Sequence, residues 1–290
     1  MSILRRCCRV RHALTKNLSA VDRPDPAEVG LELSPPLIHR AVLSAVENAR
    51  RREIVGDHLD IGSGTGELLR AFGARYPLGS FACDYTDRLM ETPGQDVAVV
   101  DLNRAPLPFA DNRFALVSCI ETIEHLENFR ALVREIYRVL QPGGLAVIFR
   151  PNILNLRSRL RYLSSGFYNL FSPIAADERD VHFTRGHISP TNCFYLAHAL
   201  QGASFSHLRI TVDKYQRHSF VVFPFFYVLT HAGNFIVYRR DSRNYRTLTQ
   251  QNIAAVCAMN SLDLLLGRTL IVTAVKLNEN TRDRVENSTA

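Results

Sequence analysis

Residues 60–66, with the sequence DIGSGTG, constrain this chain more than any other segment. They follow an apolar run that ends at Ile61 and lead into a helix-like segment, residues 67–75. A strand, a glycine-rich turn and a helix in this order form a cradle for a nucleotide-like cofactor, because glycines let the backbone approach a ligand and the helix N-terminus offers free N–H groups. The glycine spacing is G-x-G-x-G, whereas dinucleotide-binding turns use G-x-G-x-x-G. The spacing therefore disfavours a nicotinamide dehydrogenase.

Beyond this turn, apolar strands and helical segments alternate along the chain. Such alternation is typical of a parallel, doubly wound α/β sheet. A length of 290 residues suits one large domain of this class with an elaboration. The predicted strands are residues 54–61, 80–84, 97–101, 114–120, 145–149, 204–213 and 269–277; the predicted helices are residues 34–52, 67–75, 128–140 and 189–202, the last with Ser189 as N-cap and Pro190 at its first position.

The chain divides into a basic leader, a large domain and a polar tail. The expected boundaries are residues 1–33 for the irregular leader, 34–277 for the domain (core 54–150, cap region 151–203, apolar insertion 214–267) and 278–290 for the tail. The leader is expected to be a solvated tail; contact with anionic lipid or RNA, or organelle targeting, are the alternatives. The six cysteines show no C-x-x-C spacing, which indicates neither a zinc site nor a disulfide framework and favours a cytoplasmic protein, with peripheral contact to a membrane as an addition.

Three further motifs follow at successive strand ends: CDYTD around Asp84, the pair Asp101–Leu102, and NRFALVSCIETIEHL at the fourth strand. With DIGSGTG before them, they resemble the class I S-adenosylmethionine-dependent methyltransferases over residues 54–150. The resemblance implies a Rossmann-like α/β fold, a seven-stranded sheet in the order 3-2-1-4-5-7-6 with strand 7 antiparallel, and an apolar insertion before the last strand. The pattern departs at Ala115, where an Asp often follows the Phe.

The same resemblance assigns a cofactor, S-adenosyl-L-methionine, and its contacts. Asp60 would hold the amino group of the methionine portion, Asp84 the ribose hydroxyls, and Asp101 the adenine amino group. The alternative for each carboxylate is a helix cap or loop acid. The full set of implied cofactor residues is Asp60, Gly62, Ser63, Gly64, Gly66, Asp84, Tyr85, Asp101, Leu102 and Ile120.

Just past the fourth strand the chain reads Glu121-x-x-Glu124-His125, where the acceptor lies in this fold. On a helical turn these spacings would place all three side chains on one face. They could then hold one divalent ion, such as Mg²⁺, with a fourth ligand from His187 or His182. Similar runs occur in ubiquinone-pathway O-methyltransferases and small-RNA 2′-O-methyltransferases, where they are associated with a metal. The alternative is a metal-free site in which His125, with Glu121, acts on the acceptor as a catalytic acid or base.

Two later segments bear on the acceptor. Arg157, Arg159 and Arg161 either recognise an anionic acceptor or face water on an amphipathic cap helix. Residues 220–266 are strongly apolar; core or lid is the first interpretation, and peripheral docking on a bilayer, with arginines 239, 240 and 243 at the headgroups, is the second.

The predicted function is methyl transfer from S-adenosylmethionine to oxygen of a small-molecule, saccharide or lipid-linked acceptor. The alternatives are C-methylation of a quinone or lipid, 2′-O-methylation of an RNA end, and a cofactor-binding scaffold without turnover. Nucleic acid is not an expected partner, because no RNA-binding module accompanies the domain.

Overall fold

The computed structural model describes residues 35–50, 53–173, 187–217, 219–245 and 247–277. These residues contain a seven-stranded sheet in the order β3-β2-β1-β4-β5-β7-β6, which confirms the predicted α/β topology. The strands are β1 (Gly56–Ile61), β2 (Leu78–Asp84), β3 (Val97–Val99), β4 (Phe114–Ile120), β5 (Leu140–Pro151), β6 (Phe205–Val212) and β7 (Thr269–Lys276). The predicted leader and tail lie outside the described residues.

Strand direction divides the sheet in two. β1 pairs in parallel with both β2 and β4, and β4 pairs in parallel with β5. β7 is antiparallel to both of its neighbours, as predicted. Because the strand order reverses between β1 and β4, the carboxyl ends of these two strands border a crevice at the switch point of the sheet. The motifs at the ends of β1, β2 and β4 therefore meet at one edge.

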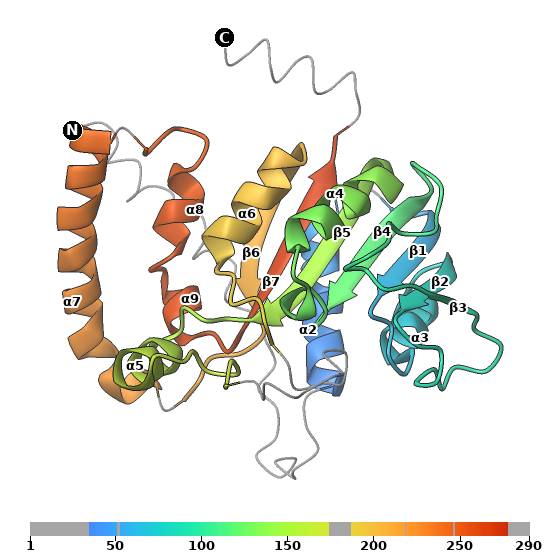
Figure 1. Ribbon diagram of the computed structural model, residues 1–290, viewed down its shortest axis with the longest axis horizontal. Helices are drawn as coiled ribbons and strands as arrows, with labels where there is room; N and C mark the ends of the chain where they lie inside the picture. The colour runs from blue at the N-terminus through green and yellow to red at the C-terminus, as the bar shows by residue number, and fades with distance from the viewer. Residues whose placement is uncertain (1–34, 51–52, 174–186, 218, 246, 278–290) are drawn as a thin grey trace.

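Helices cover both faces of the sheet (Figure 1). On one face, α2 (Pro35–Ala49) and α3 (Glu67–Arg75) bury Val42, Val46 and Phe72 against β4, β5 and β7. On the other, α4 (Phe129–Val139) and α6 (Cys193–Gly202) bury their apolar faces in the main core cluster. Side chains of parallel strands are buried on both faces, which is why β4 reads as an almost continuous apolar run.

The insertion before β7 forms a helical group at the β6 edge of the sheet (Figure 1). It contains α7 (Ser219–Arg240), a π-helical turn (Asp241–Tyr245), α8 (Ile253–Ala258) and α9 (Leu262–Leu266), and α5 (Leu156–Ser165) packs beside α7. Leu264, Leu265 and Leu266 are buried, as expected of a core segment, but much of α7 is exposed. Among the described residues, no helix is both long and apolar enough to cross a membrane.

Several predicted boundaries differ from the structure. The helix predicted to start at Ser189 begins instead at Cys193, because Asn192 is its N-cap and accepts the Tyr195 N–H, while the Ser189 carbonyl accepts a hydrogen bond from Arg150. Residues 141–144 do not form a turn between helix and strand; they belong to β5, which starts directly after α4. Cys83, Cys119 and Cys193 are buried free thiols.

Candidate functional site

The glycine turn is held at the ends of β1 and β2. The backbone N–H groups of Gly62 and Ser63 donate to the Cys83 carbonyl (2.8 and 3.3 Å), which fixes the turn on the neighbouring strand. Gly62 and Gly64 have φ values of +72° and +47°, a region that favours glycine. A Cβ at Gly62 would overlap the Thr122 side chain, whereas a Cβ at Gly64 would meet nothing within 4 Å. The turn is therefore closed beneath Gly62 and open beside Gly64, as a cradle requires.

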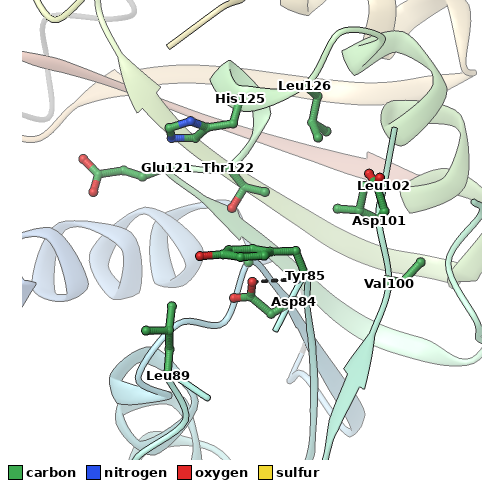
Figure 2. A pocket seen from close by; sticks show the side chains of 11 residues that line it. Asp84, Tyr85, Leu89, Val100, Asp101, Leu102, Glu121, Thr122, His125 and Leu126 are labelled. Carbon is green, nitrogen blue, oxygen red and sulfur yellow. Dashed lines mark hydrogen bonds between the residues drawn. The ribbon is translucent and has the colours of Figure 1, made fainter. Parts of the chain in front are cut away.

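Asp84, at the end of β2, bonds to the glycine turn. Its Oδ2 accepts the Gly64 N–H (2.8 Å), and its Oδ1 accepts the Tyr85 N–H (2.7 Å). Each carboxylate oxygen keeps a further lone pair, and the side chain lines the pocket shown in Figure 2. Two backbone donors thus fix the orientation of the Asp84 carboxylate in the pocket.

A pocket opens at the carboxyl ends of β1, β2 and β4. In Figure 2 Asp84 and Tyr85 lie on one side, Val100, Asp101 and Leu102 on another, and Glu121 and His125 at the far end. The structure thus brings together residues that lie more than sixty positions apart in the chain. The lining residues are Gly62, Asp84, Tyr85, Leu89, Val100, Asp101, Leu102, Glu121, Thr122, His125 and Leu126.

Asp101 lines this pocket, but its carboxylate also has local partners. Oδ1 accepts the Asn103 N–H (2.9 Å), and Oδ2 pairs with the exposed Arg104 guanidinium (3.2 Å). The hydrogen bond from Asn103 closes an Asx turn. Asp101 therefore also has the role of a loop acid, which was the alternative to cofactor binding in the sequence analysis. Because a carboxylate has about four acceptor positions, the turn leaves room for an additional donor from a ligand.

Asp60 lies beneath the turn instead of among the pocket-lining residues. Ser118 donates to its Oδ1 (2.6 Å), and the same hydroxyl lies 2.7 Å from Nε2 of the buried His58. Burial raises the pKa of Asp60 to about 7; the Ser118 hydrogen bond opposes the rise, and the charge of Asp84 adds to it. Burial also lowers the pKa of His58 to about 3. The hydrogen bonds that connect His58, Ser118 and Asp60 fix the Asp60 carboxyl group at the end of β1.

The other implied cofactor residues surround the turn. Ser63 is buried, and its hydroxyl oxygen has no hydrogen-bond partner. Gly66 precedes α3 in the left-handed region, so the helix N-terminus follows the turn directly. Ile120 ends β4, and its carbonyl lies 2.9 Å from the Thr122 hydroxyl. Gly62 lines the pocket, whereas Ser63, Gly64, Gly66 and Ile120 are not among its lining residues.

The acceptor-side motif is not a regular helical turn. Glu121 has φ +50°, and only Ile123–His125 form a short 3₁₀ helix, so the premise that all three polar residues share one helical face is wrong. Burial raises the pKa of Glu121; the positive charge of Arg268 opposes this rise and the negative charge of Asp213 adds to it. Figure 2 shows the Glu121 carboxylate pointing to one side of His125. Glu121 and His125 nevertheless both line the pocket.

A different trio converges where the metal was predicted. One potential ligand atom each from Glu124, His125 and His187 lies within 4.8 Å of the others, and Glu121 is outside this group. The backbone explains the meeting: the Glu124 carbonyl accepts the N–H groups of both Ile188 and Ser189 (3.0 Å each). The His125 and His187 ring centroids are 4.8 Å apart. His182 lies outside the described residues.

Glu124 itself is fully buried, and both of its carboxylate oxygens lack a hydrogen-bond partner. Burial raises its pKa to about 7, although the guanidinium of the buried Arg150 opposes the rise. Arg150 donates from Nη2 to the Ser189 carbonyl (3.0 Å), while its Nε and Nη1 have no partner. Unpartnered buried polar atoms are uncommon in proteins, and a bound ion or water is one way in which they are satisfied. A cation ligated by Glu124, His125 and His187 fits the carboxylate oxygens.

Of the three cap-region arginines, Arg159 is wrongly placed by both sequence interpretations. It is mostly buried and donates to the Leu154 carbonyl (2.6 Å), the Met259 carbonyl (2.7 Å) and Asn260 Oδ1 (2.7 Å). It therefore joins α5 to the turn between α8 and α9. Arg157 is exposed, and Arg161 donates to the Ser172 hydroxyl (3.2 Å).

Sequence reasoning missed four residues that shape the site: His58, Ser118, Thr122 and Arg150. His58 and Ser118 are polar residues within buried strands. A polar residue inside an apolar strand was the sequence signal that could have indicated their buried hydrogen bonds. Arg150 ends an apolar strand in the same way. No sequence signal marks Thr122, whose role depends on its contact with Gly62.

Comparisons with known proteins concern the domain and its fold. Residues 59–148 match the family described as "Methyltransferase domain". A ubiquinone/menaquinone biosynthesis C-methyltransferase (UbiE) of Desulfotalea psychrophila is 32% identical over 100 residues, which are 32% of this chain and 40% of that protein. A demethylmenaquinone methyltransferase of Thermus thermophilus is 32% identical over 117 residues, covering 38% of this chain and 51% of its own length. The match thus spans about half or less of these relatives.

A solved structure shows the same fold. The crystal structure of a SAM-dependent methyltransferase from Archaeoglobus fulgidus superposes with a TM-score of 0.52 at 15% identity, covering 84% of this chain and 95% of that one. The sheet order, the four strand-end motifs and the methyltransferase-domain match over residues 59–148 together support a class I S-adenosylmethionine-dependent methyltransferase, an enzyme. Within that class, the matched family is the methyltransferase domain of residues 59–148.

Proposed function

We propose that this protein transfers the methyl group of S-adenosyl-L-methionine to an oxygen of a small-molecule, saccharide or lipid-linked acceptor. The observation that carries the proposal is a single pocket with two distinct ends. Gly62, Asp84 and Asp101 line its cofactor end, while Glu121 and His125 line the other. The cofactor supplies an electrophilic methyl group on a sulfonium, so the chain has to position the acceptor and remove its proton.

Each part of the pocket has a definite task in this proposal. Asp84, oriented by the Gly64 and Tyr85 N–H groups, accepts hydrogen bonds from ribose hydroxyls. Asp60, fixed by Ser118, binds the cofactor's ammonium group from beneath the turn. The side chains of Leu89, Val100, Leu102 and Leu126 make the pocket largely apolar, which excludes water and strengthens these polar contacts.

His125 is the residue that we propose removes the acceptor proton. An imidazole is suited to this step because its ordinary pKa lies near neutral pH. Its ring faces the pocket in Figure 2, and the His187 ring lies edge-on beside it. Burial lowers the pKa of His187, and the charge of His125 contributes to that shift, so the site favours the neutral form of its imidazole. Glu121 lines the same end and would orient the acceptor.

We extend the proposal to an alternative in which a divalent cation is held by Glu124, His125 and His187. His125 is then a ligand and not the base, because a metal-bound neutral imidazole has no free lone pair to accept a proton. One carboxylate and two imidazoles suit Mn²⁺ or Zn²⁺ better than Mg²⁺, which prefers oxygen ligands. His187 places its Nδ1 2.7 Å from the Leu170 carbonyl, which leaves Nε2 as the atom that would ligate. A bound cation would lower the pKa of an acceptor hydroxyl. Loss of activity in chelator and recovery with Mn²⁺ or Zn²⁺ would support this extension; full activity after exhaustive chelation would remove it.

The names of the relatives favour a second candidate, C-methylation of a quinone. The two relatives above are named as quinone-pathway methyltransferases, and C-methylation is printed for the first. The same His125 would serve that reaction, because removing the proton of a phenolic hydroxyl also activates the adjacent ring carbon.

One experiment tests the proposal and separates the two candidates. The protein is incubated with methyl-tritiated cofactor and an extract of cells that lack it, and labelled products are separated into organic and aqueous phases. Hot hydriodic acid then releases label from an O-methyl group and leaves a C-methyl group intact. We expect released label that is absent with His125→Ala. Label that resists the acid would support C-methylation, and no label in either phase, with cofactor binding intact, would contradict methyl transfer.

A further inference from the structure

The outer face of α7 is apolar along its whole length. Val221, Phe225, Val228, Leu229 and Ile236 are 59–84% exposed to solvent. Their successive spacings of four, three, one and seven residues place them on one side of the helix. Monomeric soluble proteins rarely expose so continuous an apolar surface, and where one occurs it marks an interaction site.

The polar residues of α7 face inward, which is the reverse of an ordinary surface helix. Asn234 accepts a hydrogen bond from Asn260 (2.8 Å), and the Tyr238 hydroxyl donates to the Val256 carbonyl (3.1 Å). Phe223, Phe226 and Tyr227 pack on the buried cluster of Leu156, Leu265 and Leu266. These contacts fix the rotation of α7, so its apolar side is held toward the outside. Exposure is therefore a property of the fold and not of a loose helix.

Basic residues stand at both ends of this face. Arg217 precedes α7, and Arg239 and Arg240 end it, followed by Arg243. From Tyr215 to Arg240 the chain contains no Asp or Glu. Arg239 lies over the Phe235 ring, 6.0 Å from its centroid, and Asp241 is 3.7 Å from Arg240. An apolar strip with arginines at its ends matches the boundary between acyl chains and anionic headgroups.

We propose that the outer face of α7 docks the protein on the surface of an anionic bilayer, with the helix axis in the membrane plane. At 1.5 Å per residue its 22 residues extend over about 33 Å. The helix lies in the interface and does not cross it, because the exposed strip runs along its side. α5, which contacts α7, carries two further exposed residues with apolar surface, Tyr162 and Leu163.

Charge distinguishes this occupant from a second copy of the chain. An antiparallel pairing of two α7 helices would place Arg217 of each near Arg239 and Arg240 of the other, and a parallel pairing would place like ends together. Both arrangements bring guanidinium groups of the same sign into contact, which is unfavourable, whereas anionic lipid attracts both ends. The proposal concerns binding alone and does not depend on methyl transfer.

Flotation of the full chain with vesicles tests the proposal. We expect the protein to float with phosphatidylcholine vesicles that contain 30% phosphatidylglycerol, and to float far less with phosphatidylcholine alone. The double variant Val221→Glu and Val228→Glu should reduce the partition coefficient by tenfold or more, because it places charges on the exposed apolar strip that would enter the bilayer. Neutralising Arg239, Arg240 and Arg243 to Gln should reduce it by about fivefold for each arginine.

A matched control keeps the test falsifiable. Val55 is also an exposed valine, at 62%, but lies before β1 on another part of the molecule, so Val55→Glu should float like the parent protein. Circular dichroism and cofactor binding must be unchanged in every variant. Protein that stays at the bottom with anionic vesicles overturns the proposal. So does a concentration-dependent dimer in sedimentation that the Val221/Val228 variant dissociates.

Discussion

The cofactor end and the acceptor end of this molecule are built in different ways. At the cofactor end, backbone groups hold the functional side chains: Asp84 accepts two N–H groups, and Gly62 and Ser63 donate to Cys83. At the acceptor end, two segments sixty residues apart meet, and buried polar atoms of Glu124 and Arg150 remain unpartnered. The carboxylate of Asp84 thus already has hydrogen-bond partners in the first end, whereas the buried carboxylate of Glu124 has none in the second. Substitutions should therefore separate into those that affect cofactor binding and those that affect turnover.

The largest effect is expected at the glycine turn. Gly62→Ala should abolish measurable cofactor binding and lower the melting temperature, because the new Cβ overlaps Thr122 at a positive φ. Gly64→Ala should weaken binding with a smaller effect on melting, because its Cβ enters open space. Calorimetric titration and thermal unfolding measure both. Gly94→Ala, also at positive φ and with nothing within 4 Å, is the control and should bind cofactor normally.

His125→Ala tests the acceptor end. We expect kcat to fall by about 10²–10⁴-fold, the usual contribution of a general base, with cofactor affinity unchanged within about twofold. Steady-state kinetics with the identified acceptor and calorimetry with the cofactor give the two quantities. His198→Ala, an exposed histidine beside Arg130, should change neither. An equal loss of cofactor affinity in the His125 variant would erase the proposed division between the two ends.

Asp84→Asn tests the cofactor end without disturbing the turn strongly. Loss of the carboxylate charge should weaken cofactor binding by about 10–100-fold, the range for a hydrogen bond to a charged group. Saturating cofactor should then restore most of kcat. The exposed neighbour Asp87 provides the control, since Asp87→Asn should leave affinity unchanged. A fall in kcat that saturating cofactor does not restore would show that Asp84 also acts on the acceptor.

The smallest effect is a pH dependence of stability from Asp60. Its pKa is about 7 in the folded chain, against 3.8 ordinarily, so the folded state holds a proton that the unfolded state releases between these values. Stability therefore falls as pH rises from 4 to 7 and is flat above. Asp60→Asn should raise the free energy of unfolding by roughly 1–3 kcal/mol at pH 8. Urea unfolding at pH 4 and pH 8 measures this; an equal gain at both pH values would contradict the cause.

Strand-end motifs made the sheet predictable from sequence. DIGSGTG, Asp84 and Asp101 mark consecutive strands, and parallel strands bring their carboxyl ends to one edge. His187 was expected near Glu124, but its approach depends on backbone hydrogen bonds that no motif records. The position of Glu121 was not predictable, because its left-handed φ interrupts the helical spacing.

The insertion was less predictable for another reason. The apolar residues of α7 are distributed all around the helix, so the sequence shows no helical period that would indicate which face packs inward. Only tertiary partners, Asn260 for Asn234 and the Val256 carbonyl for Tyr238, decide the rotation of the helix. Those partners lie in α8 and the turn that follows it.

Glu124 contributes to this molecule through two chemically separate groups. Its carboxylate faces the cluster with His125 and His187, while its main-chain oxygen receives the amides of Ile188 and Ser189. Alanine scanning removes only the first contribution, since every residue has the same carbonyl. Replacing residue 188 by its α-hydroxy acid would convert one amide to an ester and delete one donor. Such a semisynthetic protein would reveal how far the placement of His187 is set by the peptide backbone.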